Sequence, residues 1–77
     1  MKVTIEFFDY LIDYSPKGEK KVTLLLNQDS TLKDLIEKLN IPPHLEKICF
    51  INGAYFLEDK ILKEGDTISF YPMVDGG

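Results

Sequence analysis

Apolar residues alternate with polar ones, or cluster, in five short stretches along the chain. Residues 3–7 (VTIEF) and 67–71 (TISFY) alternate as half-buried β-strands do. Residues 22–26, 48–51 and 54–57 are short apolar runs rich in β-branched, aromatic or aliphatic side chains. The pattern therefore predicts five strands, and the first two are expected to form a hairpin with a long connection.

The segments between these strands carry turn chemistry. Residues 15–18 (SPKG) combine a proline, which restricts φ, with a glycine, which tolerates positive φ. Asn52-Gly53 is the strongest short signal for a β-hairpin and joins the third strand to the fourth. Residues 63–66 (KEGD) predict a turn before the last strand. Residues 8–14 are apolar and aromatic without a clear period, and residues 58–62 form a crossing segment.

One segment has the period of an α-helix. Four apolar residues recur three and four positions apart and form a single stripe: Leu32, Leu35, Ile36 and Leu39. Thr31 and Asp34 resemble a capping box at its start, and Asn40 precedes Ile-Pro-Pro at its end. A helix with one apolar stripe must bury that stripe, and a sheet is the only large surface available to it.

The predicted order places one helix after the first hairpin and three strands after the helix. On a chain of 77 residues this order resembles the β-grasp arrangement of ubiquitin-like domains. We therefore predict an α+β fold in which residues 1–77 form one domain. Its mixed sheet of four to five strands carries one main helix on one face, and its first and last strands run parallel at the centre.

Composition narrows the classes of function. The net charge of −4 disfavours nucleic acid and anionic membrane as partners and favours a protein with a basic docking patch. No apolar run approaches the ~20 residues of a membrane span, and residue 2 leads directly into a strand rather than a signal peptide. The single cysteine cannot form an internal disulfide, which fits a reducing, cytoplasmic setting.

The ionisable residues do not assemble into a recognisable internal site. His44 is the only histidine and has neither a nucleophile nor metal co-ligands near it in sequence, so a surface residue is expected. Cys49 lies within a strand and is expected to be a small buried hydrophobe. The carboxylates are scattered without calcium-loop spacing and are expected to be solvated charges or turn residues. Gly53 and Gly65 are turn glycines, so no metal site and no bound cofactor are predicted.

The last eight residues, FYPMVDGG, are harder to explain as part of a fold. Gly76 and Gly77 pack nothing and lose the most conformational freedom on ordering. Two residues without a Cβ do form a backbone thin enough to enter a narrow active site of a partner. Pro72 would stiffen the exit from the last strand. We therefore predict that residues 72–77 form a flexible tail whose carboxylate is the reactive group.

These residues resemble a known family. Residues 62–77 are similar to the end of the small subunit of molybdopterin synthase, a sulfur carrier of the MoaD/ThiS type. The matching positions are Gly65, Asp66, Phe70, Pro72, Val74, Gly76 and Gly77. Residues 6–14 look like the early strand and short helical connection of that family, and residues 50–56 look like its middle hairpin. Met73 and Asp75 depart from the family pattern, which has a proline and a small residue there.

The resemblance implies a function for the tail. In such carriers an adenylating enzyme related to ubiquitin-activating enzymes uses ATP to activate the terminal glycine. That glycine then becomes a thiocarboxylate, which donates sulfur. Carried over, Gly77 is the modified residue, Gly76 is its slender neighbour, and the pathway is molybdopterin synthesis. The chain is then a carrier or subunit rather than a stand-alone enzyme, and a synthase large subunit is a possible second partner.

The sequence leaves other functions open. A carrier for transfer-RNA thiolation or thiamine synthesis, a ubiquitin-like modifier that joins lysines, and a plain β-grasp interaction module all fit the same fold. In each case we expect an exposed apolar patch on the sheet face away from the helix. The patch holds either Ile48 and Phe50 or Cys49 and Ile51, while Ser69 and Tyr71 share it if Ile68 and Phe70 point to the core. The predicted partner-binding residues are Phe50, Tyr71, Pro72, Met73, Val74 and Asp75.

Overall fold

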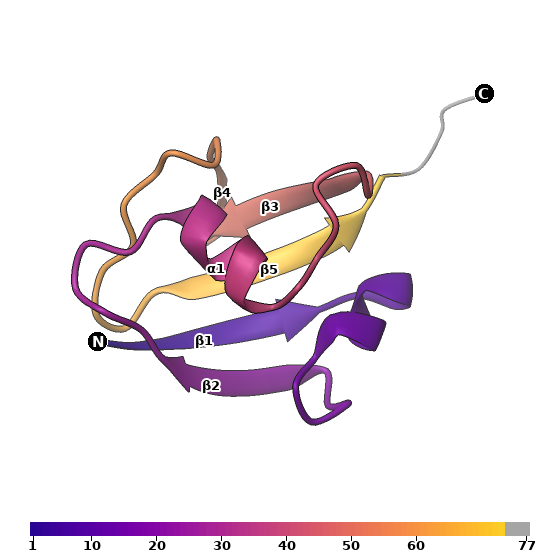
Figure 1. The fold of residues 1–77 in the computed structure, drawn as a ribbon, viewed down its shortest axis with the longest axis horizontal. Coiled ribbons are helices and arrows are strands. Elements are labelled where there is room, and N and C mark those ends of the chain that lie inside the picture. Colours follow the sequence, from indigo (N-terminus) through magenta and orange to yellow (C-terminus); the bar gives the residue numbers. More distant parts are fainter. Residues whose placement is uncertain (74–77) are drawn as a thin grey trace.

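A computed structural model describes residues 1–73 of the chain. One five-stranded sheet has the strand order β2-β1-β5-β3-β4, and Figure 1 shows the helix α1 in front of it. The strands span β1 Lys2–Phe7, β2 Lys21–Leu25, β3 Lys47–Ile51, β4 Ala54–Tyr55 and β5 Thr67–Pro72. The predicted α+β arrangement with one main helix is confirmed.

The first and last strands form the centre of the sheet. β1 and β5 run parallel, with Ile5 opposite Ile68 and Phe7 opposite Phe70. β2 pairs antiparallel with the outer side of β1, and β3 pairs antiparallel with the outer side of β5. The predicted parallel pairing and the predicted first hairpin are therefore both confirmed.

Helix α1 (Leu32–Lys38) begins and ends as its sequence predicts. The Thr31 hydroxyl accepts from the Asp34 N–H at 3.2 Å, and the Asp34 carboxylate accepts from the Thr31 N–H at 2.9 Å. These two bonds form a capping box. Asn40 lies just beyond the helix with φ 59°, a left-handed conformation that asparagine tolerates.

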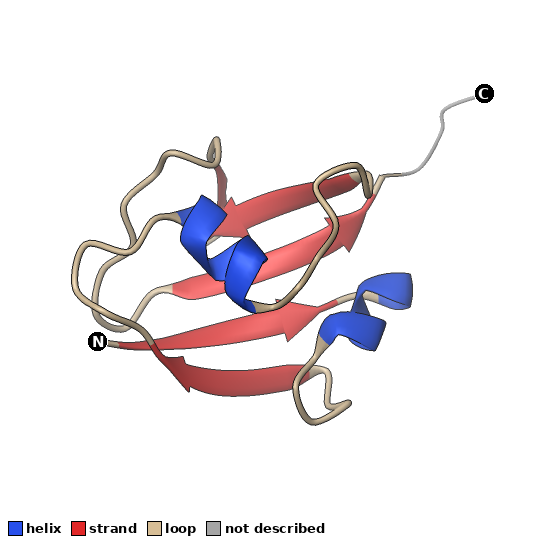
Figure 2. Cartoon of the chain, viewed as in Figure 1, coloured by secondary structure: helices blue, strands red, loops and turns tan. Residues whose placement is uncertain are grey.

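The apolar stripe of α1 packs on the sheet, and Figure 2 shows α1 (blue) in front of the strands (red). Its residues join a single core with the inward side chains of the strands: Val3, Ile5, Phe7, Val22, Cys49, Ile51, Ile68 and Phe70. Leu62 and Leu11 close this core at its two ends and are almost fully buried. The helix has only seven residues, so its stability comes from this burial rather than from helix propensity.

The apolar segment after β1 forms a short 3-10 helix, η1 (Asp9–Tyr14). Leu11 anchors it in the core with no exposed surface. The short helical connection expected from the family resemblance is therefore present.

The β3–β4 hairpin has the predicted two-residue turn, with φ 52° at Asn52 and 83° at Gly53. The fourth strand was predicted over residues 54–57, but it ends at Tyr55. After that residue the chain turns toward α1, where the Glu58 carbonyl accepts from the Lys33 N–H at 2.9 Å. The Leu57 carbonyl accepts from the Lys60 N–H at 3.2 Å, so residues 56–57 lead into a turn instead of continuing the strand.

The last strand ends one residue later than predicted. Pro72 was assigned to the tail and is instead the final residue of β5, opposite Lys47. Parallel pairing with β1 has already ended at Phe70, so a residue without an N–H is tolerated there.

Candidate functional site

Strand alternation divides the β3 residues between the two faces of the sheet. Cys49 and Ile51 belong to the buried core, whereas Ile48 and Phe50 are partly exposed on the face away from α1. Ile48 lies opposite Tyr71, which is 37% exposed. The first of the two predicted alternatives is therefore correct, and an apolar patch is present on this outer face.

Four aromatic rings on the outer face form a continuous row: Phe8, Tyr71, Phe50 and Tyr55. The rings of Phe8 and Tyr71 stack in parallel, with centroids 4.3 Å apart and an interplanar angle of 5°. Tyr71 meets Phe50 edge to face at 5.4 Å, and Phe50 meets Tyr55 at 6.4 Å. Such offset and edge-on pairs are the favoured arrangements of aromatic rings. We call this set the aromatic row.

A lysine ends the aromatic row on the side of β2. The Lys20 Nζ lies 4.5 Å from the centroid of the Phe8 ring, within the range of a cation–π contact. Glu6 lies beside the row and accepts a weak hydrogen bond from the Ser69 hydroxyl at 3.4 Å. The outer face therefore combines an apolar band with charged groups of both signs, as protein-binding surfaces commonly do.

Two hydrogen bonds of η1 and its preceding residue fix the region around the end of β5. The Phe8 N–H donates to the Phe70 carbonyl at 3.0 Å, so η1 is joined directly to β5. The Tyr10 hydroxyl donates to the Glu46 carbonyl at 2.7 Å and joins η1 to the segment before β3. Met73 follows Pro72 and is 51% exposed. The predicted site residues Val74, Asp75, Gly76 and Gly77 lie outside the described residues.

Phe50 and Tyr71 were predicted as partner-binding residues, whereas Phe8 and Tyr55 were not. The sequence contained a signal for the outward placement of both Phe8 and Tyr55. Phe8 continues the outward alternation of Thr4 and Glu6 beyond the end of β1. A two-residue turn at 52–53 places residue 55 opposite residue 50, so the contact between Tyr55 and Phe50 follows from the hairpin register.

The two residues with the most reactive side chains are placed as predicted. Cys49 is buried, and burial raises the pKa of its thiol from 9.0 to about 11, partly opposed by the charge of Lys47. The thiol is therefore protonated near neutral pH and is a poor nucleophile. His44 is exposed in the loop before β3.

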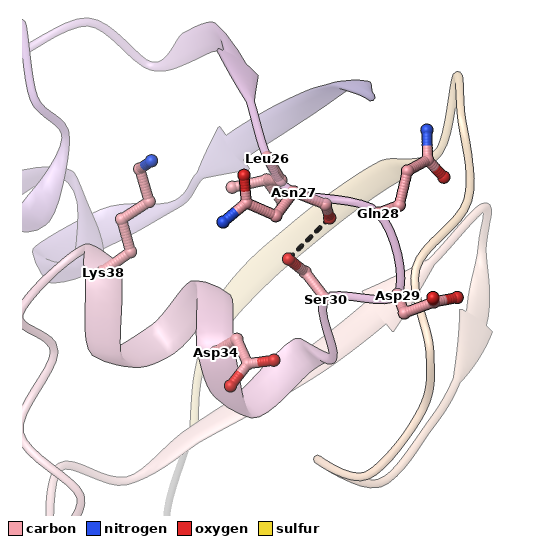
Figure 3. A pocket seen from close by; sticks show the side chains of 7 residues that line it. All are labelled: Leu26, Asn27, Gln28, Asp29, Ser30, Asp34 and Lys38. Atoms are coloured by element: carbon pink, nitrogen blue, oxygen red, sulfur yellow. Dashed lines mark hydrogen bonds between the residues drawn. The ribbon is translucent and has the colours of Figure 1, made fainter.

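A polar hollow of about 330 Å³ lies between the end of β2 and α1, and its lining is shown in Figure 3. Two of its polar side chains stabilise the local turn and the start of α1. The Ser30 hydroxyl donates to the Asn27 carbonyl at 2.7 Å, and Asp34 caps α1. These hydrogen bonds stabilise the loop and the start of α1, and they do not indicate a ligand.

Residues 1–73 contain no group of three or more metal-ligating side chains that could hold an ion. None of the helices within those residues is long and apolar enough to span a membrane.

Comparisons with known proteins agree with this geometry. Residues 1–76 match the family model Mut7-C ubiquitin, while a search of curated protein sequences finds no match. A Pyrococcus furiosus protein described as molybdopterin converting factor subunit 1 has the same fold, with a TM-score of 0.82, 22% identity, and coverage of 96% of this chain and 99% of that one.

Two more solved structures extend the comparison. Small archaeal modifier protein 1 of Haloferax volcanii has a TM-score of 0.78 at 16% identity, covering 95% of this chain and 98% of that one. A chain from the Helicobacter pylori complex of subunits 1 and 2 of molybdopterin-converting factor has a TM-score of 0.66 at 26% identity, with both chains covered completely. The ubiquitin-like β-grasp fold predicted from the sequence is therefore confirmed.

Proposed function

Since this chain belongs to the Mut7-C ubiquitin family, we propose that it is a ubiquitin-like sulfur carrier that acts through Gly77 as its terminal residue. A partner enzyme adenylates the Gly77 carboxylate with ATP and releases pyrophosphate. Hydrosulfide, or a donor at the same oxidation level, then attacks the carbonyl carbon. The carbon–sulfur bond forms as the bond to AMP breaks, so a thiocarboxylate remains and no oxidant or reductant is required.

The aromatic row is the observation that carries this proposal. Tyr71 belongs to the row and lies only six positions before Gly77. Six residues reach at most ~20 Å when extended. An enzyme that docks on the row therefore has the carboxylate within reach of its own active site. The exposed aromatic rings provide the apolar contact area that binding requires.

The comparison with the Helicobacter pylori complex supports a second partner. In that structure subunit 1 of molybdopterin-converting factor is bound to subunit 2. We place this chain in the corresponding role, as a small subunit that carries sulfur to a larger one during molybdopterin synthesis. The chemistry then belongs to the partners, and this chain acts as their substrate and subunit.

Intact mass spectrometry of the protein from its native host tests the sulfur-carrier proposal. Replacement of one terminal oxygen by sulfur is the expected result. Conjugates of Gly77 with lysines would identify a protein modifier instead, and an unmodified carboxylate after incubation with the adenylating enzyme, ATP and sulfide would refute activation altogether.

Kinetics of adenylation test the aromatic row itself. Tyr71→Ser is expected to raise the KM for this protein ~10-fold or more, because truncation of a central aromatic contact commonly costs at least ~1.4 kcal/mol. Leu25→Ser is the matched control, since Leu25 is also apolar, is 72% exposed and lies on the distant strand β2. Equal KM values for the two variants would refute docking on the row.

A further inference from the structure

A second apolar surface surrounds the crossing segment after β4. Seven side chains line an open hollow of about 690 Å³: Tyr55, Phe56, Leu57, Asp59, Lys60, Ile61 and Lys63. We call it the crossing trough. In Figure 1 this segment, in orange, curls over the side of the sheet opposite to the end of β5. The trough shares only Tyr55 with the aromatic row.

Three apolar side chains of the trough are held in solvent by a fixed backbone. Tyr55, Leu57 and Ile61 are 62%, 66% and 51% exposed. Around them the Lys60 carbonyl accepts from the Leu32 N–H at 2.9 Å, and the Leu62 N–H donates to the Ser30 carbonyl at 2.8 Å. Leu62 itself is almost fully buried. Because the segment is pinned to α1 on one side, Ile61 necessarily points outward on the other.

The same hydrogen bonds exclude recognition by strand addition. A peptide that extends a sheet needs a row of free N–H and carbonyl groups along an edge. Here the carbonyls of Glu58 and Lys60 already accept from α1, and β4 offers only two residues of edge. A partner must therefore bind the trough through side chains, which favours a helix that presents one apolar stripe.

The charges of the trough restrict that partner further. Lys60 and Lys63 lie along it, and the Lys60 Nζ is held 4.6 Å from the centroid of the Phe56 ring. Asp59 is the one opposing charge in its lining. A neighbouring hollow of about 270 Å³ shares Phe56 and both lysines and extends toward Ala54. The charged lining residues of the trough thus sum to +1 beside its apolar side chains, on a chain of net charge −4.

We propose that the crossing trough docks an amphipathic helix of a partner protein. The aliphatic residues of that helix, three and four positions apart, lie on Leu57 and Ile61. Carboxylates on one flank of the helix pair with Lys60 and Lys63, where the apolar surroundings strengthen the attraction. This docking is independent of the Gly77 chemistry and leaves the tail exit free for another protein.

Binding of stapled synthetic helices, followed by amide NMR of the isotope-labelled protein, tests the proposal. One peptide carries a leucine stripe with glutamate flanks, a second has lysines in place of the glutamates, and a third has serines in place of the leucines. The first peptide is expected to shift amides within residues 54–63. The other two should bind at least ~10-fold more weakly, the loss that corresponds to ~1.4 kcal/mol.

Substitutions in the protein locate the surface. Leu57→Ser and Ile61→Ser should each weaken the first peptide ~10-fold or more, while Leu25→Ser, an equally exposed apolar position on β2, should not. All three residues are exposed, so thermal melts should stay unchanged. Adenylation of Leu57→Ser should also remain normal, which separates this proposal from the sulfur-carrier proposal.

Several results would overturn docking at the trough. They are failure of the glutamate-flanked peptide to bind, equal binding of the lysine-flanked peptide, or amide shifts confined to the aromatic row. A concentration-dependent dimer that Leu57→Ser abolishes would assign the surface to a second copy of this chain and would equally refute a partner helix.

Discussion

Asn52→Gly is expected to loosen the join between the β3–β4 turn and the start of β5. The Asn52 side-chain N–H donates to the Asp66 carboxylate at 2.9 Å, and its carbonyl oxygen accepts from the Thr67 N–H at 2.9 Å. The other Asp66 oxygen accepts from the Lys63 N–H at 2.8 Å. Asp66 is the one charged residue buried within residues 1–73. A single amide therefore connects two turns that lie far apart in sequence.

The size of the effect follows from these two hydrogen bonds. Glycine adopts the φ of 52° at this position without steric cost, so the substitution removes the side-chain contacts alone. Each bond contributes ~0.5–1.5 kcal/mol, and the Asp66 carboxylate loses a donor in a buried site. The unfolding free energy should fall by ~1–3 kcal/mol. In a domain of this size each kcal/mol lowers Tm by ~4–8 °C.

Asn40→Gly is the matched control for urea unfolding. Asn40 has a similar φ of 59°, is exposed, and within residues 1–73 its side chain makes no hydrogen bond. Its replacement should leave the urea midpoint unchanged or slightly raised. Midpoints that fall equally for both variants would refute the reasoning, because the loss would then reflect asparagine in a turn rather than the contacts of Asn52 with Asp66 and Thr67.

Four further predictions concern Cys49, Thr31 and Gly77. Burial raises the pKa of Cys49 to about 11, so iodoacetamide should modify the folded protein at pH 8 far more slowly than the urea-unfolded chain; equal rates would contradict the buried thiol. Because that pKa lies above the ordinary 9.0, the stability that depends on the protonated thiol is present below pH 9 and is lost as pH rises to about 11. The difference in unfolding free energy between wild type and Cys49→Ala, measured across this pH range, should show that loss. Thr31→Ala should destabilise the protein by ~0.5–2 kcal/mol through the capping box, and a calorimetric Tm equal to wild type would exclude that role. Deletion of Gly77, or addition of one residue after it, should abolish thiocarboxylate formation and change stability by no more than ~0.5 kcal/mol; normal activation of either variant would show that the terminus is not the reactive group.

The sequence by itself determined the elements whose signals are local. The capping residues and apolar stripe of α1, the Asn-Gly turn and the strand alternation each depend on a few neighbouring residues, and each is confirmed. The fold class followed from their order. The tail chemistry, in contrast, came from a family resemblance at Gly76 and Gly77, and it remains a prediction.

The tertiary structure decided what depends on pairing between distant segments. Tyr71 and Phe8 stack because β1 and β5 are parallel neighbours, and Tyr71 meets Phe50 because β3 pairs on the other side of β5. Asp66 lies in the turn that was predicted for residues 63–66, and it is buried there rather than solvated, with Asn52, 14 positions earlier, donating to its carboxylate. β4 ends at Tyr55, and the segment after it turns to meet the start of α1 through the Glu58 carbonyl. Each of these outcomes depends on which distant segments become neighbours in the fold, and local sequence patterns contain no information on that.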